Sequence, residues 1–301
     1  MSPLFRGNLF FKHLAMKKII LPILILCALS VCSQAAKPKK NIYIQLYSVR
    51  DDIRTDYKNT VAKTAEAGYK GVEAADYNDG KFYDLTPEAF KSSIESVGME
   101  VLSSHTGKTL NEDISTTNWD EIWKWWDTAI KAHKAAGMKY IVLPYMPVPK
   151  TLADLKAYCD YFNQIGEKCN AAGLRFGYHN HSHEFNKIEG EMMYDYMLKN
   201  TDPSKVFFEM DVYWTVRGGQ SPVDYFNKYP GRFELLHIKD NKELGQSGMV
   251  GFDAIFQNAK VSGVKYLIVE VEQYNFAPLE SIRKSFDYLQ NNSNVKADYS
   301  K

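Results

Sequence analysis

The sequence has few cysteines, and the two that lie in its folded part cannot be joined to each other. Of the 4 cysteines, Cys27 lies in an N-terminal apolar run and Cys32 follows it closely. Cys159 and Cys169 lie on one predicted helix, separated by roughly 15 Å along its axis, which is too far for a disulfide. We interpret this second pair as buried thiols that pack as small hydrophobic groups.

A strong charge of one sign and a glycine-rich phosphate loop are also absent. The formal net charge is +1 and the Lys and Arg residues are scattered, so no basic stripe could neutralise a nucleic-acid backbone. No Gly-x-Gly-x-x-Gly or Gly-x-x-x-x-Gly-Lys pattern follows a predicted strand, which removes the usual phosphate cradle. The apolar fraction of 45% is nevertheless that of an ordinary folded protein with a sizeable core. We therefore expect no nucleic-acid partner.

A long apolar run lies near the N-terminus. From Met16 the chain reads MKKIILPILILCALSVCSQAAKPKK, and a basic start, an apolar middle and small residues at the end are the layout of a secretory signal peptide. The apolar run from Ile19 to Val31 is shorter than the ~20 residues that a membrane-spanning helix needs. We therefore expect no permanent transmembrane span.

The signal divides the chain into a leader and a single folded domain. We assign residues 1–36 to upstream sequence plus the signal peptide and residues 37–301 to the domain. The protein is expected to be exported, and to be either periplasmic or lipid-anchored at the membrane surface. LSVC, which ends at Cys32, resembles a lipoprotein signal, whereas SQA, which begins at Ser33, suits simple cleavage, so both forms stay open.

After the leader, short β-rich runs alternate with helix-like stretches. The predicted strands begin at Asn41, Gly68, Met99, Lys139, Leu174, Lys205, Phe233 and Lys265. The stretches between them, such as TPEAFKSSIESVG, often open on Thr or Asp and end in Gly, as capped helices do. This alternation predicts parallel βαβ units, and eight units predict a (β/α)8 TIM barrel of the α/β class. A doubly wound open sheet is the alternative, which the missing glycine-rich loop disfavours.

One helix that is predicted to lie outside the barrel carries three tryptophans and a histidine. We expect Trp123, Trp125 and Trp126 to pack against the barrel rather than to form a site. His133 on the same helix is expected to face solvent.

Polar residues follow the predicted strands where TIM-barrel active sites lie, at the C-terminal ends. They are Gln45, Tyr47, Glu73, His105, Tyr145, His179, His181, Glu184, Asp211, His237, Glu270 and Glu272. Residues two apart on a strand have side chains on the same face. The two members of each of three pairs are therefore expected to point in the same direction: His179 and His181, Glu209 and Asp211, and Glu270 and Glu272. A divalent cation would offset the cost of burying such carboxylates. Because the cluster holds imidazoles and carboxylates without thiolates, we expect one divalent metal ion, Mn, Co, Zn or Mg.

These motifs resemble the xylose-isomerase-like TIM-barrel superfamily, which contains the sugar phosphate isomerases/epimerases. The similar segments are IQLYSVRDD, GYKGVE, SSH, YHNHSHEF, FEMDVYW, LLHIKD and LIVEVEQY, and they cover nearly all of the chain after the leader. In the sugar epimerases of the superfamily, a Glu, an Asp, a His and a Glu at the ends of the fifth to eighth strands hold the metal. The resemblance implies metal-ligand roles for Asp211, His237 and Glu270.

The first ligand position departs from this pattern, because His179 stands where the family has Glu. Either His179 or His181 has taken over, or Glu184 reaches in from the loop. We predict Glu184 as the fourth ligand, because three carboxylates and one imidazole suit a hard divalent ion better than two of each. An imidazole is then free to transfer protons at neutral pH.

The remaining strand-end residues receive roles in catalysis or substrate binding. The predicted catalytic residues are His179, His181, Glu272 and Lys239, and the predicted substrate-binding residues are Tyr47, His105, Tyr145 and Trp214. Aromatic rings at the mouth suit the apolar face of a sugar. Endonuclease IV, in the same superfamily, has a second histidine at the position of Trp214, so the resemblance implies one metal here and argues against DNA repair.

The predicted function is metal-dependent chemistry beside a carbonyl group of a carbohydrate. The metal would polarise the carbonyl or an adjacent hydroxyl of a sugar or ketosugar, and a His or Glu would remove the α proton. Isomerisation or epimerisation is the main prediction, and β-elimination from a polyol or oxidised glycoside is an alternative with the same first step. A carbohydrate-binding barrel without catalysis is a further alternative. Expected export and the missing phosphate loop favour a neutral sugar over a phosphorylated one.

Overall fold

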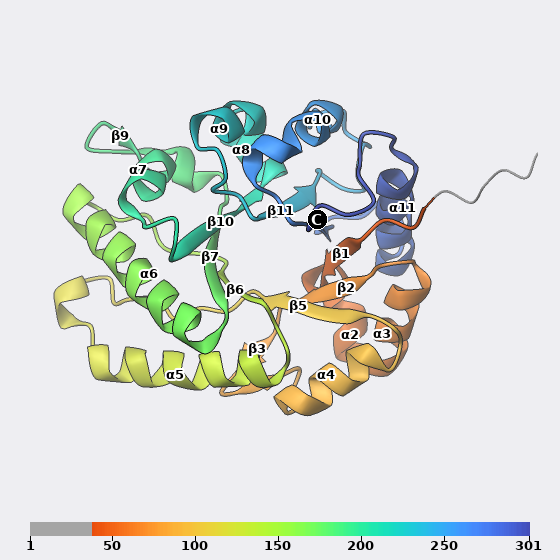
Figure 1. Ribbon diagram of the computed structural model, residues 1–301, viewed down its shortest axis with the longest axis horizontal. Coiled ribbons are helices and arrows are strands. Elements are labelled where there is room, and N and C mark those ends of the chain that lie inside the picture. The colour runs from red at the N-terminus through yellow and green to blue at the C-terminus, as the bar shows by residue number, and fades with distance from the viewer. Residues whose placement is uncertain (1–37) are drawn as a thin grey trace, which may run out of the picture. The chain divides into compact units, whose positions relative to one another are not determined.

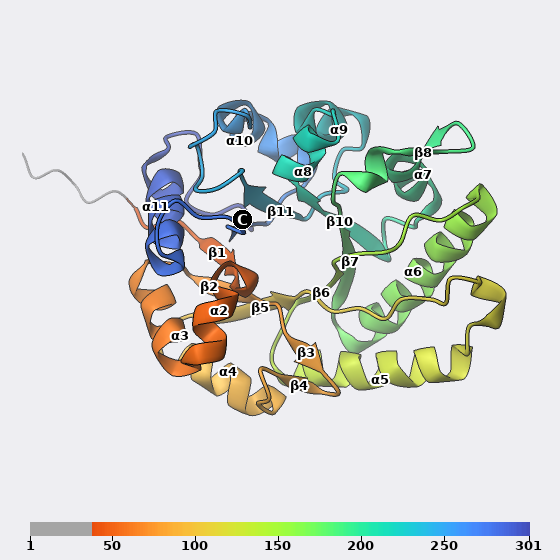
Figure 2. The same cartoon turned by 180° about the vertical axis from the view of Figure 1, so that it is seen from behind.

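Eight parallel strands form a nearly closed barrel in the computed structural model, which describes residues 38–301 (Figures 1 and 2). The strands are β1 (Ile42–Gln45), β2 (Gly71–Ala74), β5 (Glu100–Ser104), β6 (Tyr140–Leu143), β7 (Arg175–His179), β10 (Val206–Asp211), β11 (Leu235–Lys239) and β12 (Tyr266–Glu270). Their order is β5-β2-β1-β12-β11-β10-β7-β6, and an isolated parallel bridge from His105 to Val142 links the two edge strands. The predicted TIM barrel is confirmed.

Helices follow the strands and surround the barrel (Figure 1). They are α2 (Arg50–Thr55), α3 (Tyr57–Glu66), α4 (Pro87–Glu95), α5 (Trp119–Ala135), α6 (Leu152–Ala172), α7 (Met193–Asn200), α8 (Val212–Arg217), α9 (Pro222–Lys228), α10 (Phe252–Ser262) and α11 (Pro278–Asn291), with short 3-10 turns at Leu46–Val49, Ile114–Thr116 and His183–Phe185. Thr86 and Thr151 cap α4 and α6 by accepting hydrogen bonds from the backbone N–H groups of Ala89 and Asp154. At the other end of α6, Gly173 adopts a φ of 82°, a left-handed cap that favours glycine.

The N-terminal half of the barrel interior is apolar. Its buried side chains, which form a cluster separate from the outer core, are Tyr43, Leu102, Tyr140, Val142, Phe207, Leu235 and Ile268. Gly177 of β7 lies beside this cluster, where an added Cβ would come within 2.5 Å of the Phe207 ring. We call this apolar cluster the floor of the barrel. Because its side chains fill the N-terminal half of the interior, the polar side chains of the strands lie in the C-terminal half.

The helix that carries the tryptophans packs on the barrel as predicted, but His133 does not face solvent. Trp126 is fully buried against Phe176, and His133 is fully buried as well. A small hairpin, β3 (Tyr77–Asn78) and β4 (Lys81–Phe82), folds over this part of α5. The rings of Tyr77 and Phe82 lie 5.1 Å and 4.9 Å from the imidazole. The surface prediction was wrong because this hairpin covers the exposed side of the helix.

The predicted leader lies outside the described residues, and so do Cys27, Cys32 and the domain start at residue 37. Within residues 38–301, none of the helices is both long enough and apolar enough to cross a membrane. Cys159 and Cys169 are buried and free on α6, as predicted. Burial raises the pKa of each thiol to about 12, so both stay protonated near neutral pH.

Candidate active site at the carboxyl ends of the strands

A cavity of about 340 Å³ opens at the C-terminal end of the barrel. It is lined by Tyr47, Ala75, His105, Pro144, Tyr145, His179, His181, Glu270 and Glu272. Most of these residues belong to the set that the strand-end pattern predicts. The parallel strands bring them together because all eight carboxyl ends meet at one face of a TIM barrel.

Asp211, His237 and Glu270 form a compact group beside this cavity. Each offers one ligand atom, and these atoms all lie within 4.8 Å of one another. Oδ1 of Asp211 accepts a hydrogen bond from the backbone N–H of Trp214, whereas Oδ2 has no partner among the described residues. Nδ1 of His237 also has no hydrogen-bond partner there, and it lies 3.7 Å from Oε2 of Glu270.

Burial makes this group costly without a counter-charge. Asp211 is fully buried, and burial raises the pKa of its carboxyl to about 8. A buried polar atom without a partner loses its hydration without compensation. The two unpartnered atoms of Asp211 and His237, next to the Glu270 carboxylate, therefore fit a divalent cation, and oxygen and imidazole donors suit Mn, Co, Zn or Mg.

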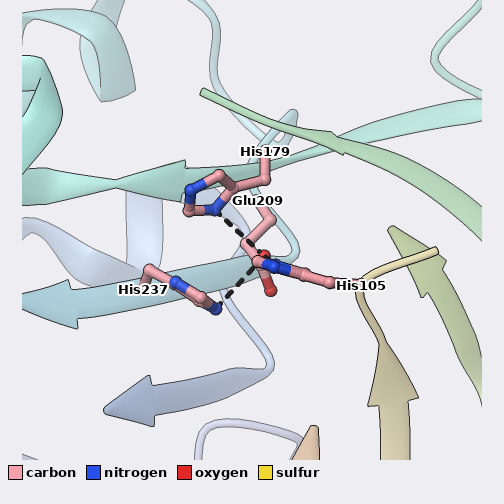
Figure 3. A group of neighbouring side chains, drawn as sticks. All are labelled: His105, His179, Glu209 and His237. Carbon is pink, nitrogen blue, oxygen red and sulfur yellow. Dashed lines mark hydrogen bonds and ion pairs between the residues drawn. The ribbon is translucent and has the colours of Figure 1, made fainter. Parts of the chain in front are cut away.

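Two buried carboxylates lie beneath the cavity and orient three imidazoles. Figure 3 shows the rings of His105, His179 and His237 turned toward Glu209. Nε2 of His105 lies 2.9 Å from Oε2 of Glu209, and Nδ1 of His179 lies 3.2 Å from the same oxygen. Nε2 of His237 lies 2.8 Å from Oε1 of Glu73. Each ring thus has one nitrogen beside these carboxylates, and the second nitrogen of His237, Nδ1, lies on the side of Glu270.

Glu73 is itself held by neighbouring strands. The side-chain amide of Gln45 donates to Oε1 at 2.9 Å, and the hydroxyl of Ser103 donates to Oε2 at 2.6 Å. Burial opposes ionisation of Glu73, but His105 and His237 outweigh it and lower the pKa of this carboxyl. Glu73 therefore accepts hydrogen bonds from three strands.

His179 and His181 line the cavity, and both have a lowered pKa. Burial, followed by the neighbouring His237 and His105, holds the pKa of His179 well below its usual value. Burial, followed by His183, lowers the pKa of His181 to about 4. Nδ1 of His181 is buried without a partner among the described residues, so this nitrogen is open to a hydrogen bond with a substrate.

Lys239 lies at the wall of the site with its charge paired. Its side chain is 2% exposed, and Nζ lies 3.5 Å from Oε2 of Glu270 and 3.1 Å from Oε2 of Glu272. Burial alone would lower the pKa of Lys239, but Glu270, Asp211 and Glu272 raise it. The ammonium group also lies over the rings of Tyr213 and Trp214, at 5.9 Å and 6.0 Å from their centroids.

Aromatic side chains form the mouth. Tyr47 and Tyr145 are exposed, and the Tyr145 ring lies 6.3 Å from that of His181. The Trp214 ring lies 5.7 Å from that of His181. The predicted substrate-contacting residues Tyr47, His105 and Tyr145 therefore line the cavity, while Trp214 borders it through His181 and Lys239.

The model of the xylose isomerase-like TIM barrel family matches residues 61–292. The chain belongs to this family. A sugar phosphate isomerase/epimerase from Parabacteroides distasonis ATCC 8503 has a similar structure, with 35% identity and a TM-score of 0.82 over 87% of this chain and 97% of that one.

More distant relatives include a dehydratase and a protein solved with zinc. An inosose dehydratase of Lacticaseibacillus casei is 22% identical over 284 residues, which cover 79% of this chain and 90% of that protein. The IOLI protein, solved with a zinc atom, shares the fold with 14% identity and a TM-score of 0.65 over 85% of this chain and 98% of that one. The family therefore includes proteins described as lyases as well as isomerases and epimerases.

The structure brings together three of the four predicted metal ligands, Asp211, His237 and Glu270. Glu184 lies apart from Asp211 and joins a different group with His181 and His183. Its Oε1 accepts a hydrogen bond from the Tyr178 hydroxyl at 2.6 Å, and its Oε2 accepts one from the backbone N–H of His181 at 2.8 Å. These contacts hold the loop that presents His181, and ligation by Glu184 stays a prediction.

Sequence reasoning assigned no role to Glu73 or Glu209, although both carried a signal. Glu73 is a strand-end residue, and Glu209 shares a face of β10 with Asp211. In this xylose isomerase-like barrel they form the layer beneath the ligand group. A second layer of acidic residues on the same strand faces is the pattern that could have identified them.

Proposed function

We propose that this protein is a divalent-metal-dependent enzyme that removes a proton next to the carbonyl of a ketosugar and returns it to give an isomer or epimer. The observation that carries the proposal is the pair of unpartnered buried atoms, Oδ2 of Asp211 and Nδ1 of His237, beside Glu270 and a sugar-sized cavity. A merely structural cluster would satisfy these atoms internally.

Asp211, His237 and Glu270 would hold the metal. A divalent ion held by these residues would supply polarisation of a carbonyl or hydroxyl oxygen of the substrate and stabilisation of the negative charge that develops on it. Glu73 orients the His237 ring through Nε2, as carboxylates commonly do for metal-binding histidines. Mixed oxygen and nitrogen donors accept several divalent metals, so the metal that is bound also depends on which metals are available to the protein.

The cavity suits a small neutral carbohydrate. Its volume of about 340 Å³ lies in the range of small-molecule sites. The rings of Tyr47 and Tyr145 offer apolar faces to a sugar ring, and the polar groups of His105 and Glu272 offer hydrogen-bond partners to hydroxyls. The predicted export signal, which we retain as a proposal, favours a sugar without phosphate.

His179 and His181 are positioned to move the proton. Both imidazoles line the cavity, and Glu209 fixes His179 through Nδ1 so that Nε2 is its free nitrogen. An imidazole with a free lone pair accepts the α proton, and its conjugate acid returns that proton to the neighbouring carbon to give an isomer. An epimer requires a proton delivered by a second acid to the opposite face of the same carbon. Lys239 supplies a buried positive charge next to Glu270 and Glu272, where it stabilises a developing oxyanion.

β-Elimination is a second candidate, because the curated relatives are inosose dehydratases. It begins with the same proton removal, after which a hydroxyl on the next carbon leaves as water. The paired Lys239 and Glu272 supply an acid for that hydroxyl.

Proton exchange tests both reactions before the product is known. The purified protein is loaded with Mn, Co, Zn or Mg and incubated in D₂O with ketoses and with inosose, and the α-proton signals are followed by NMR. We expect metal-dependent loss of an α-proton signal, with a new stereoisomer for an epimerase or an unsaturated product for a lyase. D211N is the control and should lose exchange together with bound metal. Sugar binding without exchange under any metal would favour the carbohydrate-binding barrel instead.

A further inference from the structure

We propose that a second cavity beside the candidate active site binds a glycosyl unit attached to the reacting ring, so that the substrate is an oxidised disaccharide rather than a free ketose. This inference rests on the proposed function, since it extends the substrate of the same site. The second cavity has a volume of about 400 Å³ and is formed by the loops after β5 and β6 together with the start of α6.

The two cavities adjoin at a single side chain. Tyr145 lines both of them and is 51% exposed. In this proposal, a ring bound between Tyr145 and the ligand group directs its substituent past the exposed Tyr145 side chain into the second cavity. A free monosaccharide would leave this space to solvent.

The lining of the second cavity matches a sugar better than a charged or wholly apolar group. Leu110, Ile114 and Val148 contribute apolar surface, while Thr109, Asn111 and Asp154 contribute hydrogen-bonding groups. A sugar ring likewise presents apolar C–H faces and a polar edge. Val148 is 46% exposed, and a sugar face packed on it would bury that surface.

The charges of the cavity do not call for an ionic occupant. Lys150 is paired with Glu112 at 2.7 Å, and Asp154 accepts a hydrogen bond from the Thr151 hydroxyl at 2.8 Å. No arginine lines this cavity, and bidentate arginine contacts are the usual means of holding a phosphate or carboxylate. A neutral glycosyl unit is therefore the occupant that the charges favour.

The walls are held in place by the protein itself. The backbone carbonyl of Lys108 accepts a hydrogen bond from Tyr161, and the side-chain amide of Asn111 donates to the carbonyl of Thr116 at 3.0 Å. Pro147 and Pro149 restrict the facing loop. A preformed cavity loses little conformational entropy on binding, which favours its use as a subsite.

Paired substrates and a filling variant test the subsite. The probes are methyl 3-keto-β-glucoside and 3-ketocellobiose, which carry the same oxidised ring and differ only in the group on C1. We expect kcat/KM of the metal-loaded protein to be at least about tenfold higher for 3-ketocellobiose. V148W, which fills the second cavity, should lower kcat/KM for 3-ketocellobiose about tenfold and leave the methyl glycoside within about twofold.

A matched variant controls for the bulk of tryptophan. Val261 on α10 is similarly exposed, at 39%, but lies outside both cavities. V261W should therefore leave kcat/KM unchanged for both probes. Equal use of the two probes by the unmodified protein, or an equal loss for both in V148W, would overturn the subsite.

Binding separates this inference from the proposed function. If the metal-loaded protein turns over neither probe, the proton-exchange experiment still decides the proposed function, and calorimetry with unoxidised cellobiose and glucose tests the cavity independently. We expect cellobiose to bind more tightly than glucose and V148W to remove that difference. Equal binding of the two sugars, or a difference that survives in V148W, would overturn the inference.

Discussion

Nε2 of His237 lies 2.8 Å from Oε1 of Glu73, and Nδ1 of the same ring lies on the side of Glu270, 3.7 Å from its Oε2. One buried carboxylate thus decides which nitrogen of His237 faces the ligand group. Because Gln45 and Ser103 also donate to Glu73, its position is determined by three strands at once. The orientation of a proposed metal ligand therefore depends on a residue that contacts no substrate.

E73Q is expected to weaken metal binding about 10- to 100-fold, as losses of such supporting carboxylates do. The amide keeps the shape of the side chain but replaces an acceptor by a donor, so it cannot accept from His237, Gln45 and Ser103 together. Metal affinity is measured by competition with a chelator of known affinity. S103A, which removes only the donor to the other oxygen, serves as the control and should have a smaller effect. Unchanged affinity in E73Q would remove Glu73 from this role.

E184Q and D211N separate ligation from loop positioning. The sequence predicts Glu184 as a ligand, whereas its contacts to Tyr178 and His181 favour a role in holding the loop. From these contacts we expect D211N to empty the site, and E184Q to keep most of the metal while turnover falls. Elemental analysis of both variants after mild purification measures this. If E184Q loses metal as D211N does, the fourth ligand is Glu184 and the loop must move to deliver it.

His133 is expected to make the protein less stable at mildly acidic pH. Burial lowers the pKa of His133 to about 4, below the value near 6.5 of an unfolded histidine. As the pH falls through 6.5 the unfolded chain takes up a proton that the folded chain refuses, so stability is lost from about pH 6.5 down to about pH 4.

Between pH 7 and pH 5, the free energy of unfolding of H133N should therefore fall by about 2 kcal/mol less than that of the unmodified protein. Asparagine can keep the bond to the carbonyl of Ala129 without titrating. Urea unfolding measures the free energy of unfolding at the two pH values. A packing loss caused by the smaller asparagine side chain lowers both values equally and cancels in the difference. Y77F changes the neighbouring ring but adds or removes no group that titrates in this range, and it should behave as the unmodified protein. A parallel loss in H133N would contradict the assignment.

G177A should destabilise the barrel by about 1–3 kcal/mol, because an added Cβ would overlap the buried Phe207 ring. G251A is the control for an added methyl group, since nothing lies within 4 Å of its added Cβ. Because Gly251 is the N-cap of α10, where alanine is less favourable than glycine, G251A should cost no more than about 1 kcal/mol. Thermal unfolding of both variants measures the difference. Equal stability of the two would mean that the floor of the barrel repacks freely.

Much of the fold could be predicted from the sequence because it depends on local pattern. Apolar runs of strand length, Thr caps such as Thr86 and Thr151, and a terminal Gly173 each act within a few residues. Repeated eight times, they leave few arrangements other than a barrel. The barrel then brings strand ends together, which is why their polar residues could be predicted to share one face. The resemblance to the family then singled out Asp211, His237 and Glu270 among them.

Only the tertiary structure decided what these side chains touch. Glu73 and His237 are 164 residues apart, and no local pattern relates them. Glu184 lies in the loop beyond β7, from which the sequence predicts that it reaches into the ligand group, yet Tyr178 and the backbone of His181 occupy both of its oxygens. His133 is buried by a hairpin from another part of the chain. Periodicity determines which face of an element is apolar, but the partner of each polar atom depends on rotamers and packing among distant segments.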